Sequence, residues 1–476
     1  MKNSLLIEKA YHNGSFITSK KTFDVINPAN QKAMGHMPNL QTKDCEQFII
    51  SAHQAWKSWK DTSVTDRANL LIKLASLVND HKAELAEIMT LESGKPINES
   101  LTEVDYANSF ITWFAEESKR SYGLTIPAST NNIRMQTIKQ GIGVVAAITP
   151  WNFPLAMITR KLAPALASGC TIVIKPASQT PFSAVALAQL ADQAGFPKGV
   201  INVITSTNSQ AIGEILATHQ LVRKITFTGS TAVGKTLMEL AASTIKRISL
   251  ELGGNAPFLV FNDADIDKAV TGAIAGKFRN TGQTCVSINR FYIQDKVYDT
   301  FSKKLTKAVK ALQVGDGLNT NTQVGPLIND KGLQKVQEHI ADALGKGAKL
   351  ETGGKNIQGL FFEPTVLTNM HKQSKIATEE TFGPICALFK FTTEEEAIAL
   401  ANDTPFGLAS YFYSNNIHQC IRVSEQLEAG MVGVNTGLIS NAAAPFGGVK
   451  QSGLGREGST YGMDEYQEIK YICLGM

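Results

Sequence analysis

One cysteine in this sequence of 476 residues has the surroundings of a nucleophile. Cys285 lies in the stretch FRNTGQTCVSINR, directly after a glycine, a glutamine and a threonine at positions 282–284. A lone cysteine is most often buried and inert, but these small polar neighbours predict an open approach lined by backbone N–H groups. Because the thiolate is the nucleophilic form, a reaction at Cys285 also needs a lowered pKa or a nearby base.

Two other residues have side chains that such a reaction would use. Glu251 ends an apolar strand in LELGGNAP, and parallel α/β sheets build their sites at such strand ends. Held away from water, its carboxyl would have a raised pKa and act as a general base near neutral pH; a solvated loop carboxylate is the alternative. Asn152, in TPWNFPLAMITRK, is either a turn residue or an amide donor to an oxyanion, worth about 3–4 kcal/mol.

A glycine-rich stretch introduces a different chemistry. Residues 229–236 read GSTAVGKT, which fits the P-loop pattern of nucleotide triphosphatases, and a strand-like RKITF precedes them. In that interpretation the run FLVFND, which ends at Asp263, would be the Walker-B strand of the nucleotide triphosphatase. Lys175, at the end of TIVIK, is either a solvated lysine or one that faces a crevice and holds a nucleotide hydroxyl or phosphate.

The N-terminal part of the chain is expected to be helical and then to change character. Residues 44–119 have a helical pattern, within which one helix is predicted from a cap at Thr65 to Gly94. Residues 121–141 alternate in polarity and contain proline and asparagine, as an extended hairpin would.

The rest of the chain predicts two α/β series. From GVVAAIT to KRISLEL, short apolar strands alternate with helices, one of them at 181–194 with Pro181 at its first position and Gly195 just past its end. This alternation predicts a parallel, doubly wound sheet. A second series begins at APFLVF, and the tail DEYQEIKYICLGM is expected to be a closing strand.

The composition excludes several classes of protein. The chain is 43% apolar and 18% charged, with a net charge of +4, as in ordinary globular proteins of two or three domains. It has no run of five Lys or Arg and no apolar run near the ~20 residues that span a bilayer, so nothing supports a nucleic-acid or membrane partner. The six cysteines form no C-x-x-C pair and do not cluster with the histidines, which predicts no disulfides, no metal site and a reducing cytoplasm.

Taken together, the motifs resemble those of the aldehyde dehydrogenase superfamily. The match rests on TPWNFP, IKPASQTP, FTGST followed by GK, ELGGNAP, GQTC, EETFGP and PFGGVKQSGLGREG, in the family's order from about Ile26 to the C-terminus. Cys285 lies 34 residues after Glu251 and 133 after Asn152, as the family pattern expects.

The resemblance implies a role for each residue of the site. Cys285 would attack an aldehyde to give a thiohemiacetal, and Asn152 with the Cys285 backbone N–H would hold the oxyanion. Hydride transfer to a nicotinamide would leave a thioester, which water activated by Glu251 would hydrolyse. The residues implied to bind the cofactor are Thr149, Pro150, Trp151, Lys175, Ser178, Gly229, Ser230, Glu380 and Phe382.

A finer resemblance is to the succinate-semialdehyde dehydrogenases. It implies that Arg160, Arg279 and Ser440 bind the distal carboxylate of the aldehyde, and a guanidinium fork suits a carboxylate well. A semialdehyde with one more methylene, such as glutarate semialdehyde, remains an alternative because that difference is worth only ~1–3 kcal/mol in a pocket.

Two positions depart from common patterns in the family. Ser287 stands where some relatives have a second cysteine, so no disulfide switch is predicted. Ser178 stands three residues after Lys175, where NAD-preferring relatives often have a glutamate. Without a carboxylate that would repel a 2′-phosphate, NADP is the expected cofactor, with NAD also possible.

The resemblance also implies a domain division and an assembly. We expect a Rossmann-like dinucleotide-binding domain in residues 1–120 and 142–252, an α/β catalytic domain in 253–455, and a β oligomerisation arm in 121–141 and 456–476. The expected assembly is a homo-oligomer, a dimer or more specifically a homotetramer, acting on a small aldehyde in γ-aminobutyrate (GABA) degradation. The competing hypotheses are a P-loop nucleotide triphosphatase and an inactive relative with a structural role.

Overall fold

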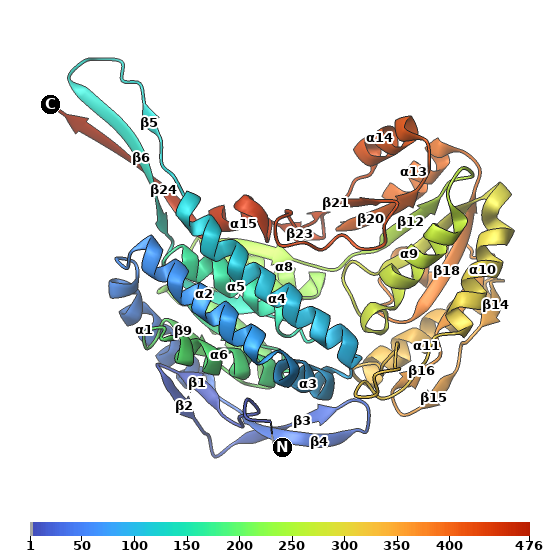
Figure 1. The fold of residues 1–476 in the computed structure, drawn as a ribbon, viewed down its shortest axis with the longest axis horizontal. Helices are drawn as coiled ribbons and strands as arrows, with labels where there is room; N and C mark the ends of the chain where they lie inside the picture. Colours follow the sequence, from blue (N-terminus) through green and yellow to red (C-terminus); the bar gives the residue numbers. More distant parts are fainter. Residues whose placement is uncertain (1–2) are drawn as a thin grey trace.

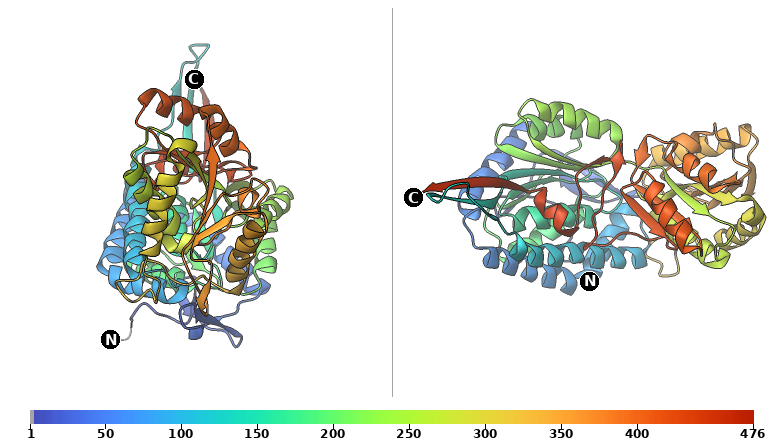
Figure 2. Two further views of the ribbon diagram at one scale, coloured as in Figure 1. Left: turned by 90° about the vertical axis from the view of Figure 1, so that its right-hand side faces the viewer. Right: turned by 90° about the horizontal axis from the view of Figure 1, so that it is seen from above.

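The computed structural model describes residues 3–476, which form two helix-covered β-sheets and a projecting β-ribbon (Figure 1). Seen from above in Figure 2, the two helix-covered sheets lie side by side and the ribbon extends from one of them. No helix among residues 3–476 is long and apolar enough to cross a membrane.

The first sheet is the predicted doubly wound one. In spatial order its strands are β2 (Ser15–Ile17), β1 (Ala10–His12), β9 (Ile201–Val203), β8 (Thr171–Lys175), β7 (Val144–Ile148), β10 (Val222–Thr228), β11 (Arg247–Glu251) and β23 (Gly453–Leu454). The five strands from β9 to β11 are parallel. Strand order reverses between β7 and β10, so the crevice outside their carboxyl ends is a natural site for a ligand.

Helices cover both faces of this sheet because its central strands are apolar on both sides. Along β7, Val144 and Ala146 pack into one cluster with residues of α1 (Thr42–Trp59) and α7 (Ser209–Thr218). Val145 and Ala147 pack into the opposite cluster. That cluster includes residues of α2 (Val64–Asp80), α3 (Lys82–Ser93), α4 (Ile97–Glu117), α5 (Ala156–Ala167) and α6 (Phe182–Ala194). Such continuous apolar strands are typical of parallel sheets.

The helix predicted between Thr65 and Gly94 differs from the structure at its start and agrees with it at its end. The helix predicted from Thr65 to Gly94 is two helices, α2 and α3, which meet at His81. The N-cap of α2 is Ser63 instead of Thr65, and its Oγ accepts a hydrogen bond from the Asp66 N–H at 3.1 Å. Serine and threonine are both good N-cap residues, so the sequence allowed either position. Gly94 ends α3 with a φ of 76°, as predicted.

The second sheet is also mostly parallel. Its strands in spatial order are β14 (Lys349–Thr352), β17 (Thr365–Thr368), β18 (Ile385–Phe391), β13 (Ile288–Gln294), β12 (Ala256–Val260), β20 (Ala409–Tyr413) and β21 (Met431–Val434). Its helices are α9 (Ile266–Phe278), α10 (Tyr298–Lys310), α11 (Asp330–Gly345), α12 (Lys375–Thr378), α13 (Glu394–Asn402) and α14 (Ile417–Gln426). Phe258 and Leu259 pack into clusters on opposite faces.

Three small ladders lie outside these sheets. They pair β3 (Thr22–Asn27) with β4 (Lys32–Pro38), β15 (Asn356–Gln358) with β16 (Phe361–Phe362), and β19 (Phe406–Gly407) with β22 (Val449–Lys450).

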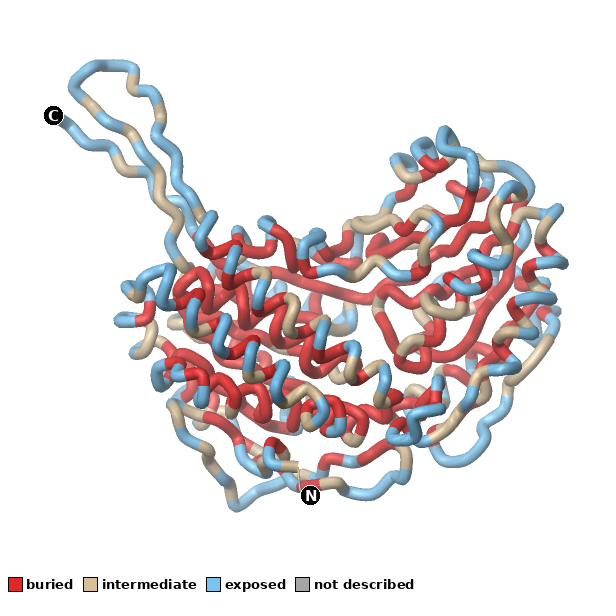
Figure 3. Tube along the Cα trace, in the orientation of Figure 1, coloured by how far each residue is buried: buried red, intermediate tan, exposed pale blue. Residues whose placement is uncertain are grey.

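The projecting ribbon contains β5 (Thr125–Ile126), β6 (Ile133–Gly141) and β24 (Gln467–Gly475), the last being the predicted closing strand. Figure 3 shows the ribbon as exposed or half-buried over most of its length. β24 pairs with β6 along nine residues, and its other edge has no strand beside it among residues 3–476.

The C-terminal segment is divided differently from the predicted ranges. β23 lies inside the range 253–455 expected for the catalytic domain, yet it is the last strand of the first sheet, antiparallel to β11. The helix α15 (Ser459–Asp464) lies inside the range 456–476 expected for the arm, yet it packs against α4 and α5. A two-residue strand and a six-residue helix carry too little periodicity to be recognised in sequence.

Candidate active site

The residues predicted from the first α/β series meet at one edge of the first sheet. The Thr149 N–H, after β7, donates to the carbonyl of Lys175 at the end of β8, with an N···O distance of 3.1 Å. The Gly229 N–H, after β10, donates to the carbonyl of Glu251 at the end of β11 at 3.0 Å. These bonds lie at the carboxyl ends of the strands on both sides of the order reversal, where a doubly wound sheet binds its ligand.

Cys285 follows a strained turn at the end of α9. Asn280 and Thr281, in the one-turn helix η2 (Arg279–Gly282), have φ angles of 50° and 60°, which non-glycine residues rarely adopt. The structure differs from the predicted open approach, because residues 282–284 are buried and only Cys285 is partly exposed. Hydrogen bonds of Gln283 with Asn280 and with the 326–328 segment fill that side of the turn.

Asn152 is tied to this turn by two amide hydrogen bonds. Its Nδ2 donates to the carbonyl of Gln283 at 3.0 Å, and the Nδ2 of Asn280 donates to the Asn152 carbonyl at 2.9 Å. An asparagine amide has two N–H donors, so one donor of Asn152 is left for another acceptor. The structure therefore brings Asn152 and the Cys285 loop together, although they are 133 residues apart.

The acid–base groups both have raised pKa values. Glu251 is buried, and burial together with the charge of Glu457 raises its pKa well above 4.5, against the opposing charge of Arg160. The predicted direction of this shift is confirmed. Burial also raises the pKa of Cys285 to about 12, against the charge of Arg160. The thiol is therefore protonated near neutral pH and needs a base to become a nucleophile.

A buried charged cluster that sequence reasoning missed lies beside Glu251. Glu457 forms ion pairs with Arg160 and Lys161, and the Lys161 Nζ also donates to the Thr228 Oγ at 2.6 Å. All four side chains are buried. The sequence did contain a signal, because two adjacent basic residues lie inside the mostly apolar helix α5. Such residues are almost never fully buried unless they are paired, so they indicate an acidic partner elsewhere in the chain.

A second missed group holds the loops of the site from the side of α4. Glu103 accepts hydrogen bonds from the N–H groups of Leu155 and Ala156 at 3.0 and 3.1 Å, at the start of α5, and forms a buried ion pair with Lys95. Glu99 accepts from the Asn280 N–H at 2.7 Å. Helix α4 therefore fixes both the loop that carries Asn152 and the turn that precedes Cys285.

Two of the three residues expected to bind a carboxylate line one cavity, while Arg160 is ion-paired with Glu457 outside its lining. Arg279 and Ser440 line one small cavity between α9 and the segment after β21. The Arg279 guanidinium rests on the Phe153 ring, 5.0 Å from its centroid, and makes no ion pair or side-chain hydrogen bond in the part of the chain described. Arg160 lies 3.9 Å over the Phe446 ring. The positive charges of both arginines act on Cys285.

The expected cofactor residues from the second sheet also reach this edge. Glu380 accepts a hydrogen bond from the Gly254 N–H at 3.2 Å, and burial raises its pKa to about 7. Phe382 has a φ of 56°, and its ring meets the Trp151 ring edge-on at 5.6 Å.

The opposite end of the cofactor region is positive and polar. Burial lowers the pKa of Lys175 to about 8, and its Nζ donates to the carbonyl of Pro176 at 3.2 Å. Ser178 is half-buried nearby in sequence, with its Oγ 3.4 Å from Gln179 Oε1. Ser230 caps α8 (Thr231–Ala242), whose N-terminus suits a phosphate. The buried Thr149 Oγ has no hydrogen-bond partner among the described residues, so these residues fit a dinucleotide.

The structure does not support the P-loop interpretation of residues 229–236. Lys235 lies on the exposed part of α8, where its Nζ donates to Gln451 Oε1 at 3.1 Å. Asp263 follows β12 in the second sheet, and its carboxylate accepts from the N–H groups of Asn415 and Asn416. The two supposed motifs therefore belong to different sheets.

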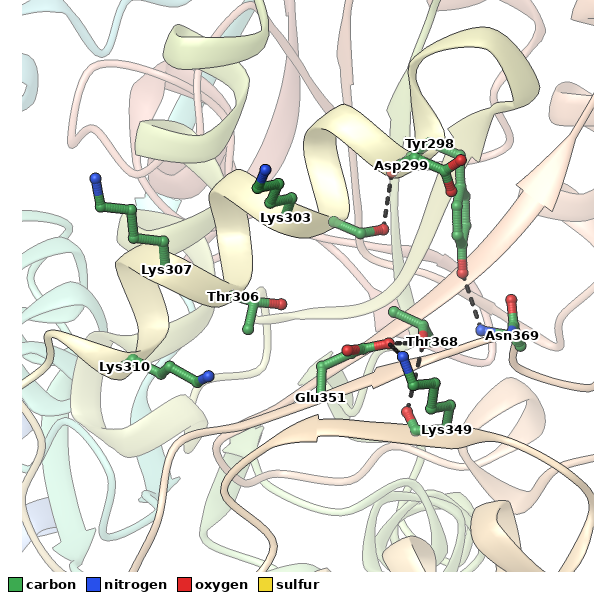
Figure 4. A pocket seen from close by; sticks show the side chains of 11 residues that line it. Tyr298, Asp299, Lys303, Thr306, Lys307, Lys310, Lys349, Glu351, Thr368 and Asn369 are labelled. Carbon is green, nitrogen blue, oxygen red and sulfur yellow. Dashed lines mark hydrogen bonds and ion pairs between the residues drawn. The ribbon is translucent and has the colours of Figure 1, made fainter.

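A surface cavity of about 570 Å³ lies away from the predicted site, between α10 and the strands β14 and β17. Figure 4 shows Lys303, Lys307 and Lys310 spread along α10 rather than pointing to one spot, while Lys349 pairs with Glu351 at 3.0 Å. No group of His, Cys, Asp or Glu within residues 3–476 is arranged to hold a metal ion.

Comparison with known proteins shows the family of this chain. The family model described as "Aldehyde dehydrogenase family" matches residues 16–472, and the chain belongs to that family. It is 54% identical to the NADP(+) succinate-semialdehyde dehydrogenase GabD of Escherichia coli (strain K12), over 100% of this chain and 99% of the relative. It is also 54% identical to a glutarate-semialdehyde dehydrogenase of Pseudomonas putida, over 99% and 98% of the two chains.

A solved structure described as an E. coli NADP-dependent enzyme matches the whole fold. Its TM-score is 0.98 at 53% identity, with 100% of this chain and 99% of that chain covered. The predicted fold class, with a Rossmann-like cofactor domain and an α/β catalytic domain, is confirmed.

The raised pKa of Glu251 leads to a pH prediction. Only the ionised carboxylate can accept a proton, so kcat/KM should rise as pH increases through a pKa well above 4.5. Glu251→Gln should abolish this acid limb and lower kcat/KM by about 10²- to 10⁴-fold. Initial rates across the acid and neutral range test this. The matched control is Glu468→Gln, at an exposed position of β24. An unchanged acid limb in Glu251→Gln would assign the limb to another group.

Proposed function

We propose that this protein oxidises succinate semialdehyde to succinate with NADP. One observation carries the substrate assignment: the Arg279 guanidinium, which pairs with no carboxylate of residues 3–476, lines a small cavity with Ser440 and acts by its charge, as Arg160 does, on Cys285. A cationic cavity beside a nucleophilic thiol suits an aldehyde with a carboxylate at its far end. The names of relatives at 54% identity support the same substrate class.

The proposed reaction begins at the thiol. Glu251 takes the Cys285 proton, and the thiolate attacks the aldehyde carbon to form a thiohemiacetal. The free N–H of Asn152 and the Cys285 backbone N–H donate to the oxyanion, a type of contact worth about 3–4 kcal/mol. Bound NADP supplies a hydride acceptor for the C–H hydrogen of this intermediate, which becomes a thioester. After Glu251 has released the Cys285 proton to solvent, it takes a proton from water, and the resulting hydroxide adds to the thioester carbonyl and displaces the Cys285 thiolate, which releases the carboxylate product.

The buried charge around Glu251 explains how it serves twice as a base. Glu457 raises the pKa of Glu251, while Arg160 and Lys161 lower it. Glu251 Oε2 is buried without a hydrogen-bond partner among the residues described, so it is available to a water or a thiol. A carboxylate with a raised pKa is a stronger base than an exposed glutamate.

Glutarate semialdehyde is the second candidate substrate. One relative at 54% identity carries that name, and the same two arginines would receive its carboxylate. One methylene is worth only about 1–3 kcal/mol in a pocket, so the longer aldehyde is expected to be a substrate with lower efficiency.

A substrate series tests the proposed function. With saturating NADP, kcat/KM should fall from succinate semialdehyde to glutarate semialdehyde and further to butanal, which lacks the carboxylate. Arg279→Ala should lower kcat/KM for succinate semialdehyde about 10- to 100-fold, because a charge-assisted pair is lost, and should leave butanal nearly unchanged. Arg422→Ala, which removes an exposed ion pair with Glu394, is the matched control.

Two outcomes would contradict this proposal. Equal efficiency with butanal and succinate semialdehyde in the wild-type protein would remove the carboxylate assignment. A lack of turnover with every aldehyde would favour the hypothesis of an inactive relative.

The NADP assignment rests on Lys175 and Ser178. Ser178 adds no negative charge beside the buried Lys175, so a 2′-phosphate would meet an ammonium and a hydroxyl. Ser178→Glu should raise the KM for NADP about tenfold or more by like-charge repulsion, and should leave or lower the KM for NAD. Steady-state kinetics with each cofactor measure this, with Ser178→Gln as the uncharged control. A higher kcat/KM with NAD in the wild-type protein would contradict the assignment.

We propose a cytoplasmic homo-oligomer, a tetramer or else a dimer, built through the ribbon, with a role in GABA degradation. The six cysteines are all free thiols, which suits a reducing compartment. The outer edge of β24 carries unpaired backbone groups and exposed Ile469, Tyr471 and Leu474. Long exposed edges of this kind are usually covered by another chain.

The size of the assembly tests the proposed role of the ribbon. Light scattering should give a mass of several times the 51.5 kDa chain. Ile469→Glu should shift the mass toward the monomer, because a charge would be buried in an apolar contact. The control Ile245→Glu changes a residue that is 94% exposed on the first domain and should leave the mass unchanged. A monomeric wild-type protein would contradict the proposal.

A further inference from the structure

Tyr106, in the middle of α4, has a buried hydroxyl with no hydrogen-bond partner among residues 3–476. Its ring packs edge-on against Phe110, with centroids 4.9 Å apart and an interplanar angle of 70°. The same Phe110 ring lies 5.6 Å from the Arg160 guanidinium carbon. Buried tyrosine hydroxyls almost always find a partner, so this orphaned group indicates a place for an absent one.

The groups that face this hydroxyl are the ones around the proposed carboxylate site. Burial raises the pKa of Tyr106, and the charges of Arg160 and Arg279 oppose this, as does the Ser440 hydroxyl, which faces the phenolic oxygen as a donor and leaves the Tyr106 O–H without an acceptor. By contrast, Tyr411, which lines the cavity of Arg279 and Ser440, donates its hydroxyl to the Val286 carbonyl at 2.9 Å. Tyr411 is therefore a satisfied structural tyrosine, and Tyr106 is not.

Donors are in excess at this point of the structure. The Arg160 Nη2 is buried and has no hydrogen-bond partner within the described chain. The nearest acidic group, Glu457, already pairs with Arg160 and Lys161. Arg160, Arg279 and Tyr106 thus offer donors in one region, and Glu457, the acidic group whose charge acts on Tyr106, is already paired. A carboxylate has two oxygens with about four acceptor sites, which matches this number of donors better than one water would.

We propose that the Tyr106 hydroxyl donates a hydrogen bond to the distal carboxylate of the substrate and helps to select carboxylate-bearing aldehydes. The inference rests on the proposed oxidation of a semialdehyde and adds a residue of α4 to the two arginines and the serine. Tyr106 lies on the helix that also fixes the loops of Asn152 and Cys285 through Glu103 and Glu99. The carboxylate end and the reacting end of the substrate would therefore be positioned by one rigid element.

Tyr106→Phe isolates the hydroxyl. A hydrogen bond to a charged acceptor is worth enough to change binding about 10- to 100-fold, so KM for succinate semialdehyde should rise by about that factor. The change in kcat should be small, because the distal carboxylate is bound equally in the ground and transition states. Butanal should be oxidised as efficiently as by the wild type. The inhibition constant of the product succinate, measured against the semialdehyde, should rise in parallel with KM.

Thermal unfolding provides a second readout. The Tyr106 O–H has no acceptor in the ligand-free protein, so the Tm of the ligand-free Tyr106→Phe variant should stay close to that of the wild type. The matched control is Tyr11→Phe, which removes a hydroxyl bonded to Asp192 at 2.7 Å in the first domain. That variant should lose stability and keep the wild-type KM for succinate semialdehyde.

The possible outcomes separate this inference from the proposed function. An unchanged KM and an unchanged succinate inhibition constant in Tyr106→Phe would overturn the role of the hydroxyl while the wild-type preference for the semialdehyde still held. Equal losses with butanal and succinate semialdehyde would also overturn it, since they would show a structural defect. A wild-type protein without any preference for the carboxylate would instead contradict the proposed function.

Discussion

The site depends on a buried negative charge that two cations hold in place. Glu457, from the segment after β23, pairs with Arg160 and Lys161 of α5, and Lys161 also bonds Thr228 at the end of β10. Removing one partner of such a cluster typically costs about 3–5 kcal/mol, because a buried charge is left uncompensated. The cluster therefore fixes the C-terminal segment, α5 and β10 relative to one another. Its field also sets the pKa of Glu251, through the opposing effects of Glu457 and the two cations.

Helix α4 extends this constraint to the reacting groups. Glu103 binds the N-terminus of α5 and Glu99 binds the backbone of Asn280, so two carboxylates of one helix hold the loops of Asn152 and Cys285. The turn before Cys285 contains two non-glycine residues in the left-handed region, which costs of order 1–3 kcal/mol for each. The surrounding hydrogen bonds compensate for this cost, and a preorganised site needs little rearrangement when an oxyanion forms.

Short sequence patterns in this protein specify local structure but not the tertiary position of their residues. The P-loop pattern at 229–236 correctly predicted a helix N-terminus that suits a phosphate. The nucleotide triphosphatase that it also predicted was wrong. The pattern describes only a local turn, whereas Lys235 and Asp263 are placed by tertiary structure, one on an exposed helix face and one in the other sheet. The predicted open approach at 282–284 failed for a similar reason. Small polar residues there are buried because Gln283 makes hydrogen bonds to the turn and to a distant segment.

The sequence by itself determined the family, the doubly wound sheet and the residues whose side chains could take part in a reaction. These follow from alternating strands and helices and from ordered motifs, both of which are local properties of the chain. Only the tertiary structure decided that Glu457, Lys161, Glu103 and Tyr106 lie around α5 and its N-terminal loop, beside the predicted site residues. Their roles depend on burial and on partners tens to hundreds of residues away. The sequence alone does not reveal whether a charged or hydroxyl side chain is exposed or buried. The physical reason is desolvation, which acts on groups only after the chain has brought them together.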